Sequence, residues 1–240
     1  VRGEHVGQLV RAQYGADAVL VGEQTSDAAG DVLCRGRLWG ALATLLERIG
    51  DALLDQGRWQ TILTWLDDAD EQSIHGDPRL GYWKGMATVP QAPDQALPWL
   101  AEAVAGFEAS GQYMEQLRAL CGVCEAIYYR YIDFKALDEW VPLLERLIAE
   151  PSIQDDAPLE ARALIARIQA VYLRGPTMMA VDPLADRLIQ LLRQGLPAGQ
   201  TVEFGTRLLA VLAQMGDSDR SQSVFGLVDP QAHLTSIPPL

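Results

Sequence analysis

The sequence predicts an all-α fold, a right-handed α-solenoid of about four to five antiparallel helical hairpins. Tryptophan returns in similar helical contexts at Trp65, Trp99 and Trp140, with spacings of 34 and 41 residues. Repeat periods in this range, each filled by two helical stretches, are typical of stacked helix pairs. Apolar residues also recur at three- and four-residue steps, and most proline and glycine residues fall between these runs. Because one helix pair cannot bury its apolar face alone, the pairs must stack on one another.

The three repeating tryptophans are predicted to be packing wedges between successive hairpins. An indole buries a large apolar area, and repeating it buries a similar seam in each repeat. A ligand-binding cage would need the indoles clustered in one place, whereas these occur once per repeat.

The composition and charge of the chain exclude several classes of protein. The 240 residues are 49% hydrophobic, which is ordinary for a folded protein. A net charge of −13 repels phosphate groups, so we expect neither nucleic acid nor an anionic membrane surface as a partner. No apolar run approaches the ~18 residues of a membrane span. Three cysteines form no even disulfide framework, and we therefore expect a cytoplasmic location.

Residues 1–30 carry the weakest pattern and are expected to be a lead-in to the repeats. The pattern is compatible with a short helix over residues 5–14 and a strand over residues 18–21. Small polar residues at 22–30 predict a linker. The helical period begins at Asp31, and we expect one helical repeat domain over residues 31–217.

The first two hairpins are predicted from apolar stripes and helix-end signals. A stripe over residues 38–54 ends at Gly57, and a shorter helix follows it. Asp77 and Pro78 form a cap followed by a first-turn proline, which predicts a helix start. The partner of that helix is expected over residues 93–110.

Two further hairpins and one single helix are expected in the second half of the chain. The expected ranges are 112–132, 134–150, 158–174, 182–194 and 201–215. Pro142 predicts a kink or a delayed start in its helix. Asp182 and Pro183 repeat the combination of cap and first-turn proline. Residues 218–240 are expected to be a weakly structured tail.

Cys121 and Cys124 form the pattern that most resembles a chemical motif. A metal site needs a second pair of ligands at suitable spacing, and the sequence has none. A redox dithiol needs a helix start beside a strand, whereas these cysteines lie within a helix on an apolar stripe. We therefore predict packing residues, with no catalytic site, no metal site and no cofactor. A thiol-dependent enzyme is the alternative.

The first helix of the third pair carries charged and aromatic residues on a second face. Arg118, Glu125 and Tyr129 lie on that face at steps of seven and four residues. In the fourth pair, Arg167 and Arg174 repeat the seven-residue step. If the first helices line the inner curve, these rows face a groove, where aromatic and arginine side chains favour contacts. The candidate partner-binding residues are Tyr82, Arg118, Glu125, Tyr129, Arg167 and Arg174; an ordinary solvated face is the alternative.

Part of the chain resembles a known family of regulators. The segment Gly57-Arg-Trp-Gln-Thr-Ile-Leu-Thr-Trp-Leu66 and the helix start Asp77-Pro-Arg-Leu80 resemble the tetratricopeptide-like (TPR-like) solenoid of large bacterial ATP-dependent transcriptional regulators. These are the signal-transduction ATPases related to the maltose-regulon activator, and the similarity runs from Arg37 to Met215. The resemblance implies a sensor arm that binds an inducer or a regulatory protein. The family's phosphate loop and helix-turn-helix have no matching positions here.

Three classes of function remain open at this point. The first is a non-catalytic regulatory interaction or sensor module of a transcriptional regulator, which binds a protein or peptide partner or a small-molecule effector in the solenoid groove. The second is a general TPR scaffold for protein assembly. The third is an enzyme that uses the thiols of Cys121 and Cys124.

Overall fold

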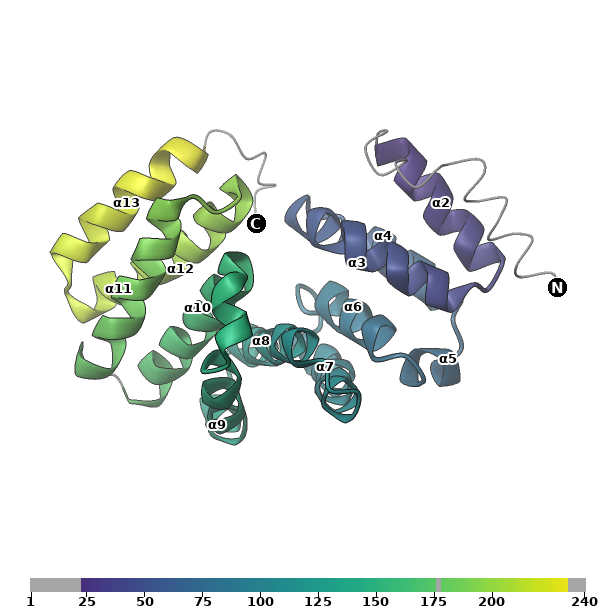
Figure 1. Cartoon of the computed structure of the whole chain (residues 1–240), viewed down its shortest axis with the longest axis horizontal. Helices are drawn as coiled ribbons and strands as arrows, with labels where there is room; N and C mark the ends of the chain where they lie inside the picture. The colour runs from purple at the N-terminus through teal and green to yellow at the C-terminus, as the bar shows by residue number, and fades with distance from the viewer. Residues whose placement is uncertain (1–22, 176–177, 233–240) are drawn as a thin grey trace.

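The computed structural model describes residues 23–175 and 178–232 of the chain (Figure 1). Over these residues the fold is all-helical: 12 α-helices and two short 3-10 helices pack against one another, and no strand is present. The predicted all-α class is thereby confirmed. The helix and strand expected over residues 5–14 and 18–21 lie outside the described residues, as does the end of the chain, 233–240. None of the described helices has the length and apolarity of a membrane span.

The described helices follow one another with short connections. The α-helices are α2 (Glu23–Arg35), α3 (Trp39–Asp55), α4 (Trp59–Asp67), α5 (Glu71–His75), α6 (Pro78–Thr88), α7 (Pro93–Ala109), α8 (Tyr113–Arg130), α9 (Leu137–Ile148), α10 (Ala157–Arg174), α11 (Met178–Gln194), α12 (Ala198–Met215) and α13 (Ser218–Ala232). The two 3-10 helices are η2 (Phe134–Ala136), before α9, and η3 (Pro151–Asp155), before α10.

Helix ends follow local sequence signals at several places. The carboxylate of Asp77 accepts a hydrogen bond from the backbone N–H of Arg79 at 3.0 Å, and Pro78 is the first residue of α6, as predicted. Asp156 caps α10 in the same way, through a first-turn N–H at 3.0 Å. These bonds satisfy N–H groups that have no partner inside the helix. The predicted end of the first helix is also observed, since Gly57 has φ of 71° just after α3.

The position of the proline differs from the prediction in α11 but not in α9. α11 begins at Met178 rather than at Asp182, so Pro183 lies inside it. The 3-10 helix η2 occupies residues 134–136, so α9 begins at Leu137, after the predicted start at residue 134, and Pro142 lies inside it as predicted. Each proline is the sixth residue of its helix, so its missing N–H removes one intrahelical bond. Burial of the apolar helix face outweighs that loss.

Two segments that were expected to lack regular structure are helical where the structure describes them. Residues 23–30 belong to α2 instead of a linker, and residues 218–232 form α13 instead of a weakly structured tail. Packing holds both helices. A Cβ atom built on Gly30 would lie 2.3 Å from the indole of Trp65, and one built on Gly205 would lie 2.3 Å from Val228. These glycines allow α2 to approach α4, and α12 to approach α13, more closely than any larger residue would.

Successive helices pack so that the elements follow an arc (Figure 1). α6 packs against α7, α7 against α8 and α12 against α13. In addition, the helices α3, α6, α8, α10 and α12 form a series in which each contacts the next, and we call them the first-helix series. The buried apolar residues form two clusters that meet in α10, where Ala163 belongs to one and Ala161 to the other. The two halves of the fold are therefore joined through α10.

The three repeating tryptophans do not share one environment. Trp65 is 3% exposed, and its indole packs against α2. Trp99 and Trp140 are only partly buried. A second buried indole belongs to Trp83, which is 2% exposed and would lie 2.4 Å from a Cβ atom on Gly50 of α3. The wedge prediction is confirmed for Trp65. Trp99 and Trp140 also pack against the buried core, Trp99 by stacking on the His75 ring of α5 at 4.9 Å, but both stay partly exposed.

Candidate binding site

Polar side chains from all five helices of the first-helix series come together. They are Asp51 and Asp55 from α3, Tyr82 from α6, Arg118 and Glu125 from α8, Arg162 and Gln169 from α10, and Glu203 and Arg207 from α12. We call these residues the polar ring. Members from the same helix are four or seven residues apart, a spacing that places them on one helical face.

Two contacts join the first four helices of the series. Nη1 of Arg118 lies 2.9 Å from Oδ2 of Asp51, which links α8 to α3. Nη1 of Arg162 donates to the hydroxyl oxygen of Tyr82 at 3.4 Å, which links α10 to α6. Each contact therefore passes over one helix of the series and connects residues that are far apart in the sequence.

Arg207 links α12 to α10 and α8. Its Nη2 donates to Oε1 of Gln169 at 2.7 Å. Its Nη1 lies 2.9 Å from Oε1 of Glu203 and 3.7 Å from Oε1 of Glu125. The guanidinium carbon also lies 5.8 Å from the ring centroid of Tyr128. With its side chain only 13% exposed, Arg207 is held from several sides.

The ring closes between the last helix of the series and the first. A Cβ atom built on Gly199, one turn before Glu203 in α12, would lie 3.6 Å from Oδ2 of Asp55 at the end of α3. Figure 1 shows the corresponding ends of α3 and α12 turned toward each other. The last helix of the series therefore comes close to the first at the Asp55 end of the polar ring.

Burial raises the pKa of three groups of the polar ring. Burial raises the pKa of Glu125, while the positive charge of Arg207 opposes the rise. Burial and the negative charge of Glu203 raise the pKa of Asp55, while Arg162 opposes the rise. Burial also raises the pKa of Tyr82, whose phenol is therefore a hydrogen-bond donor at neutral pH. Such perturbed groups in one concave region are typical of binding sites.

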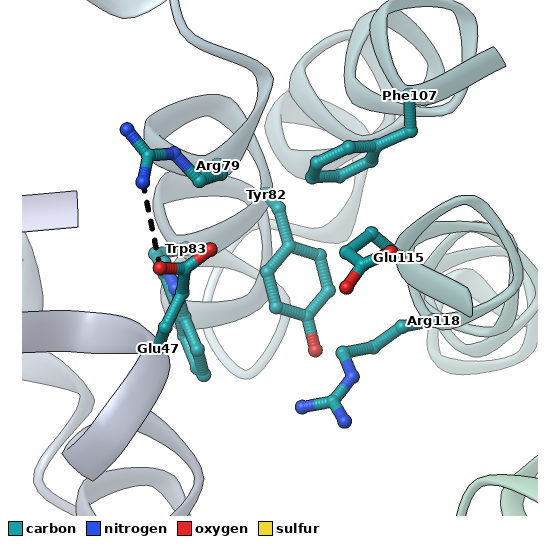
Figure 2. Close-up of a pocket in the computed structure, with 7 residues that line it drawn as sticks. All are labelled: Glu47, Arg79, Tyr82, Trp83, Phe107, Glu115 and Arg118. Carbon is teal, nitrogen blue, oxygen red and sulfur yellow. Dashed lines mark hydrogen bonds and ion pairs between the residues drawn. The ribbon is translucent and has the colours of Figure 1, made fainter. Parts of the chain in front are cut away.

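A cavity of about 180 Å³ opens at one end of the polar ring (Figure 2). Its apolar wall is formed by Tyr82, Trp83 and Phe107, each no more than 3% exposed. Charged side chains complete the lining: Glu47, Arg79, Glu115 and Arg118. Figure 2 shows the Tyr82 hydroxyl pointing to the side where the Arg118 guanidinium lies. The cavity and the polar ring thus share Tyr82 and Arg118.

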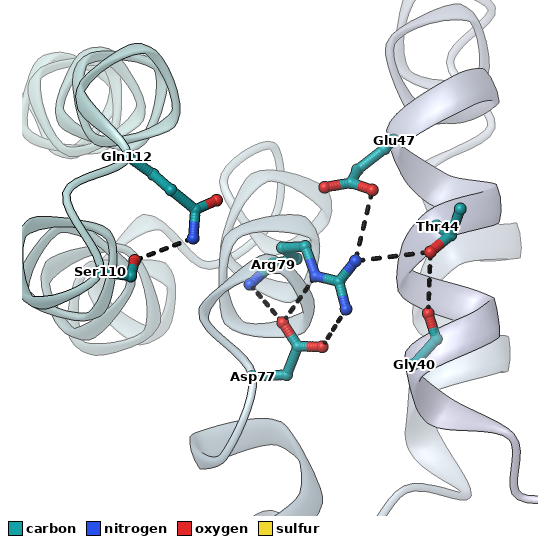
Figure 3. Close-up of polar contacts among 7 residues, drawn as sticks. All are labelled: Gly40, Thr44, Glu47, Asp77, Arg79, Ser110 and Gln112. Carbon is teal, nitrogen blue, oxygen red and sulfur yellow. Dashed lines mark hydrogen bonds and ion pairs between the residues drawn. The ribbon is translucent and has the colours of Figure 1, made fainter.

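One side of the cavity rim is held in place by a network around Arg79 (Figure 3). The Arg79 guanidinium donates to both carboxylate oxygens of Asp77, at 2.9 and 2.7 Å. It also lies 3.4 Å from Glu47 and from the hydroxyl of Thr44, which itself donates to the carbonyl oxygen of Gly40 at 3.0 Å. The same Asp77 caps α6, so the helix start and the rim are fixed together.

Four of the six residues predicted from the sequence lie in or next to the polar ring. Tyr82, Arg118 and Glu125 belong to it. Tyr129 lies one turn after Glu125, is 52% exposed and packs edge-on against Tyr128. The exposed aromatic side chain of Tyr129 thus follows the charged residues on the same face of α8.

The other two predicted residues, Arg167 and Arg174, do not reach the polar ring. Nη2 of Arg167 lies 2.7 Å from Glu145, and Nε of Arg174 lies 2.6 Å from Asp138. Both acidic partners belong to α9, so this face of α10 is turned toward α9. A different face of α10, a fraction of a turn away from Arg167 and Arg174, contributes to the polar ring, and the sequence did not predict it. Its residues are Arg162 and Gln169; Asp51, Asp55, Glu203 and Arg207 were also missed.

The two cysteines of α8 are buried as free thiols. Burial raises the pKa of Cys121 to about 12, and burial also raises the pKa of Cys124. Both are thus protonated at neutral pH, which does not suit a nucleophile or a metal ligand. Over the described residues, no cluster of three or more His, Cys, Asp and Glu side chains is placed to hold a metal ion.

Comparisons with known proteins add no relative to this picture. No family model, no curated protein and no solved structure matches the chain.

Proposed function

We propose that the chain is a non-catalytic binding module, the sensor or interaction arm of a bacterial transcriptional regulator. In this proposal the helix pairs form a right-handed, TPR-like α-solenoid with the first-helix series on its inner face. The polar ring then lines the groove of the solenoid. There it binds a protein or peptide partner or a small effector.

The observation that supports the proposal is the polar ring. Charged residues that only keep a protein soluble are usually exposed and separate. Apart from the exposed Asp55, the ring members are partly or fully buried and are joined across five helices. Buried ion pairs add little net stability, because the loss of hydration offsets their attraction. Charged groups held at the wall of a groove are suited to select a ligand by complementary charge.

The thiol-enzyme alternative has less support from the geometry. The pKa of Cys121, raised to about 12 by burial, leaves almost no thiolate at neutral pH. Neither cysteine lines the cavity of Figure 2. A packing role for both residues agrees with their position between closely packed helices.

The proposal is tested by a pair of double variants. Asp51→Asn with Arg118→Gln removes one ion pair of the ring and leaves no single charge behind. The matched control, Asp138→Asn with Arg174→Gln, removes an ion pair between α9 and α10 that lies outside the ring. We expect both variants to keep the helix content and melting temperature of the wild type.

Binding is then measured with two probes, a fractionated metabolite extract in a thermal-shift assay and protein capture on the immobilised chain. An effector at 100 times its dissociation constant adds about 2.7 kcal/mol of stability. We expect the wild type and the control to respond and the ring variant to lose the response. Equal responses from all three would refute the ring as the binding site. A metabolite shift supports the sensor, whereas capture without such a shift supports the TPR scaffold.

A further inference from the structure

The cavity of Figure 2 is lined by two arginines whose charges are already matched. The guanidinium of Arg79 donates to both carboxylate oxygens of Asp77, at 2.9 and 2.7 Å. Nη1 of Arg118 lies 2.9 Å from Oδ2 of Asp51. Neither aspartate belongs to the lining, so each arginine is neutralised from outside the cavity. An anionic ligand would have to compete with these two carboxylates for the arginines.

The two carboxylates of the lining are not matched in this way. Among the described residues, the partly buried Glu115 makes no hydrogen bond or ion pair. Glu47 has only Arg79, at 3.4 Å, and Asp77 holds that guanidinium more closely, at 2.7 Å. Two arginines against four carboxylates, those of the lining and those that hold the arginines, leave a net charge of −2. The cavity therefore favours a cation.

The rest of the lining suits a cation that carries an apolar chain. Figure 2 shows Glu47 and Glu115 on opposite sides of the Tyr82 ring. Tyr82, Trp83 and Phe107 supply the apolar wall. Carboxylates accept hydrogen bonds from an ammonium group, and aromatic ring faces attract cations. The volume of about 180 Å³ admits a short alkyl chain, since a cavity of ~150 Å³ can hold a benzene ring.

We propose that this cavity binds an alkylammonium ion, whose ammonium group contacts Glu115 and Glu47 and whose alkyl chain packs against the aromatic wall. The inference rests on the proposed function and names the class of ligand for the part of the site at Tyr82 and Arg118. The chain's net charge of −13 favours the approach of cations and repels anions. A free amine and the lysine side chain of a peptide present the same group, so the experiment includes both.

The experiment measures binding to the full chain by calorimetry at constant ionic strength. The probes are n-butylamine, for a free amine, and Nα-acetyl-lysine methylamide, for a lysine side chain. 1-Butanol and butyrate keep a similar alkyl chain but remove or reverse the charge. We expect saturable binding of at least one amine, with the alcohol and butyrate bound about 10-fold more weakly or worse, as for a lost hydrogen bond to a charged group.

Each outcome of this comparison decides something. Tighter binding of butylamine supports a free amine as the ligand, and tighter binding of the lysine derivative supports a peptide; both agree with the inference. Absence of saturable binding by both amines would overturn it. Equal binding of 1-butanol or butyrate would also overturn it, because the charge would then contribute nothing.

Three variants, each with one glutamate replaced by glutamine, locate the site. Glu115→Gln and Glu47→Gln should each weaken binding of the amine by about 10-fold or more. The matched control is Glu139→Gln, on an exposed residue of α9 that does not line the cavity and has no partner among the described residues. It removes the same charge and should bind like the wild type.

The control separates a local contact from the general attraction of cations to an acidic chain. None of the three glutamates is fully buried, so we expect all three variants to fold, and far-UV circular dichroism checks this. Unchanged binding in a folded Glu115→Gln chain would overturn the inference, as would an equal loss in Glu139→Gln. If neither amine binds while the Asp51/Arg118 double variant still loses its response, the proposed function stands and this inference fails.

Discussion

Glu125 carries its charge at a place where burial opposes it. Its side chain is 15% exposed, and its nearest cation, Arg207, lies 3.7 Å away. Burial raises the pKa of Glu125, and the attraction to Arg207 does not cancel the rise. The charged carboxylate is therefore less favourable in the folded chain than in water, and this difference couples folding to pH.

In the wild type, the raised pKa of Glu125 should lower the free energy of unfolding as pH rises. Glu125→Gln should abolish this pH dependence. Below the unfolded-state pKa of ~4.3 the carboxyl group is protonated in both states and adds no pH dependence. Above it, the unfolded chain releases its proton first, so the free energy of unfolding falls until pH passes the raised folded-state pKa. Urea unfolding from about pH 4 to pH 8 measures this, and the advantage of the variant should grow with pH. A difference that is constant over this range would contradict the raised pKa.

Residue spacing predicts part of the ring and fails where two faces of one helix are similar. Arg118 and Glu125 were identified because they share a face of α8 that also carries Tyr129. On α10 the sequence offers two arginine rows, and one residue step turns a helix by about 100°. The row of Arg167 faces α9, whereas the row of Arg162 faces the ring. The orientation of α10 against α9 decides between them, and no local pattern records that orientation.

At the scale of an element, α3 contains two glycines with opposite surroundings. A Cβ atom on Gly50 would lie 2.4 Å from the Trp83 ring, whereas one on Gly40 would meet nothing within 4 Å. We expect Gly50→Ala to destabilise the fold by about 1–3 kcal/mol, because the rigid indole cannot shift without disturbing its neighbours. Gly40→Ala in the same helix should be neutral or stabilise by up to ~1 kcal/mol. Chemical denaturation compares the two; equal effects would mean that Trp83 does not pack on Gly50.

Helix ends could be predicted where the signal lies in neighbouring residues. Whole helices were not predicted where packing against residues far away in the sequence stabilises them. The start of α6 needs only Asp77 and Pro78, which are neighbours in the sequence. α2 has little apolar content of its own and is held by the Trp65 indole, 35 residues after Gly30. α13 likewise depends on the contact between Val228 and Gly205. Composition predicted a linker and a tail there, because composition does not record which partner a helix meets.

At the scale of the whole molecule, each helix packs mainly against helices that are near it in the sequence. Each helix of the first-helix series contacts the next, and the two buried clusters meet in α10. Helices further apart in the series meet through polar residues of the ring, as between α3, α8 and α12. The stability of such a chain is close to a sum of neighbour terms, so its ends should open before its middle.

Hydrogen exchange should therefore follow position along the chain. We expect the slowest amide exchange in α8 and α10, which have packed helices on both sides, and the fastest in α2 and α13, which form the ends of the described array. Exchange measured by mass spectrometry on peptides from each helix tests this order. A ligand in the polar ring should slow exchange at α3 and α12 together, because the ring closes between them. Uniform exchange across all helices would instead indicate one cooperative globular core and would contradict the proposed solenoid.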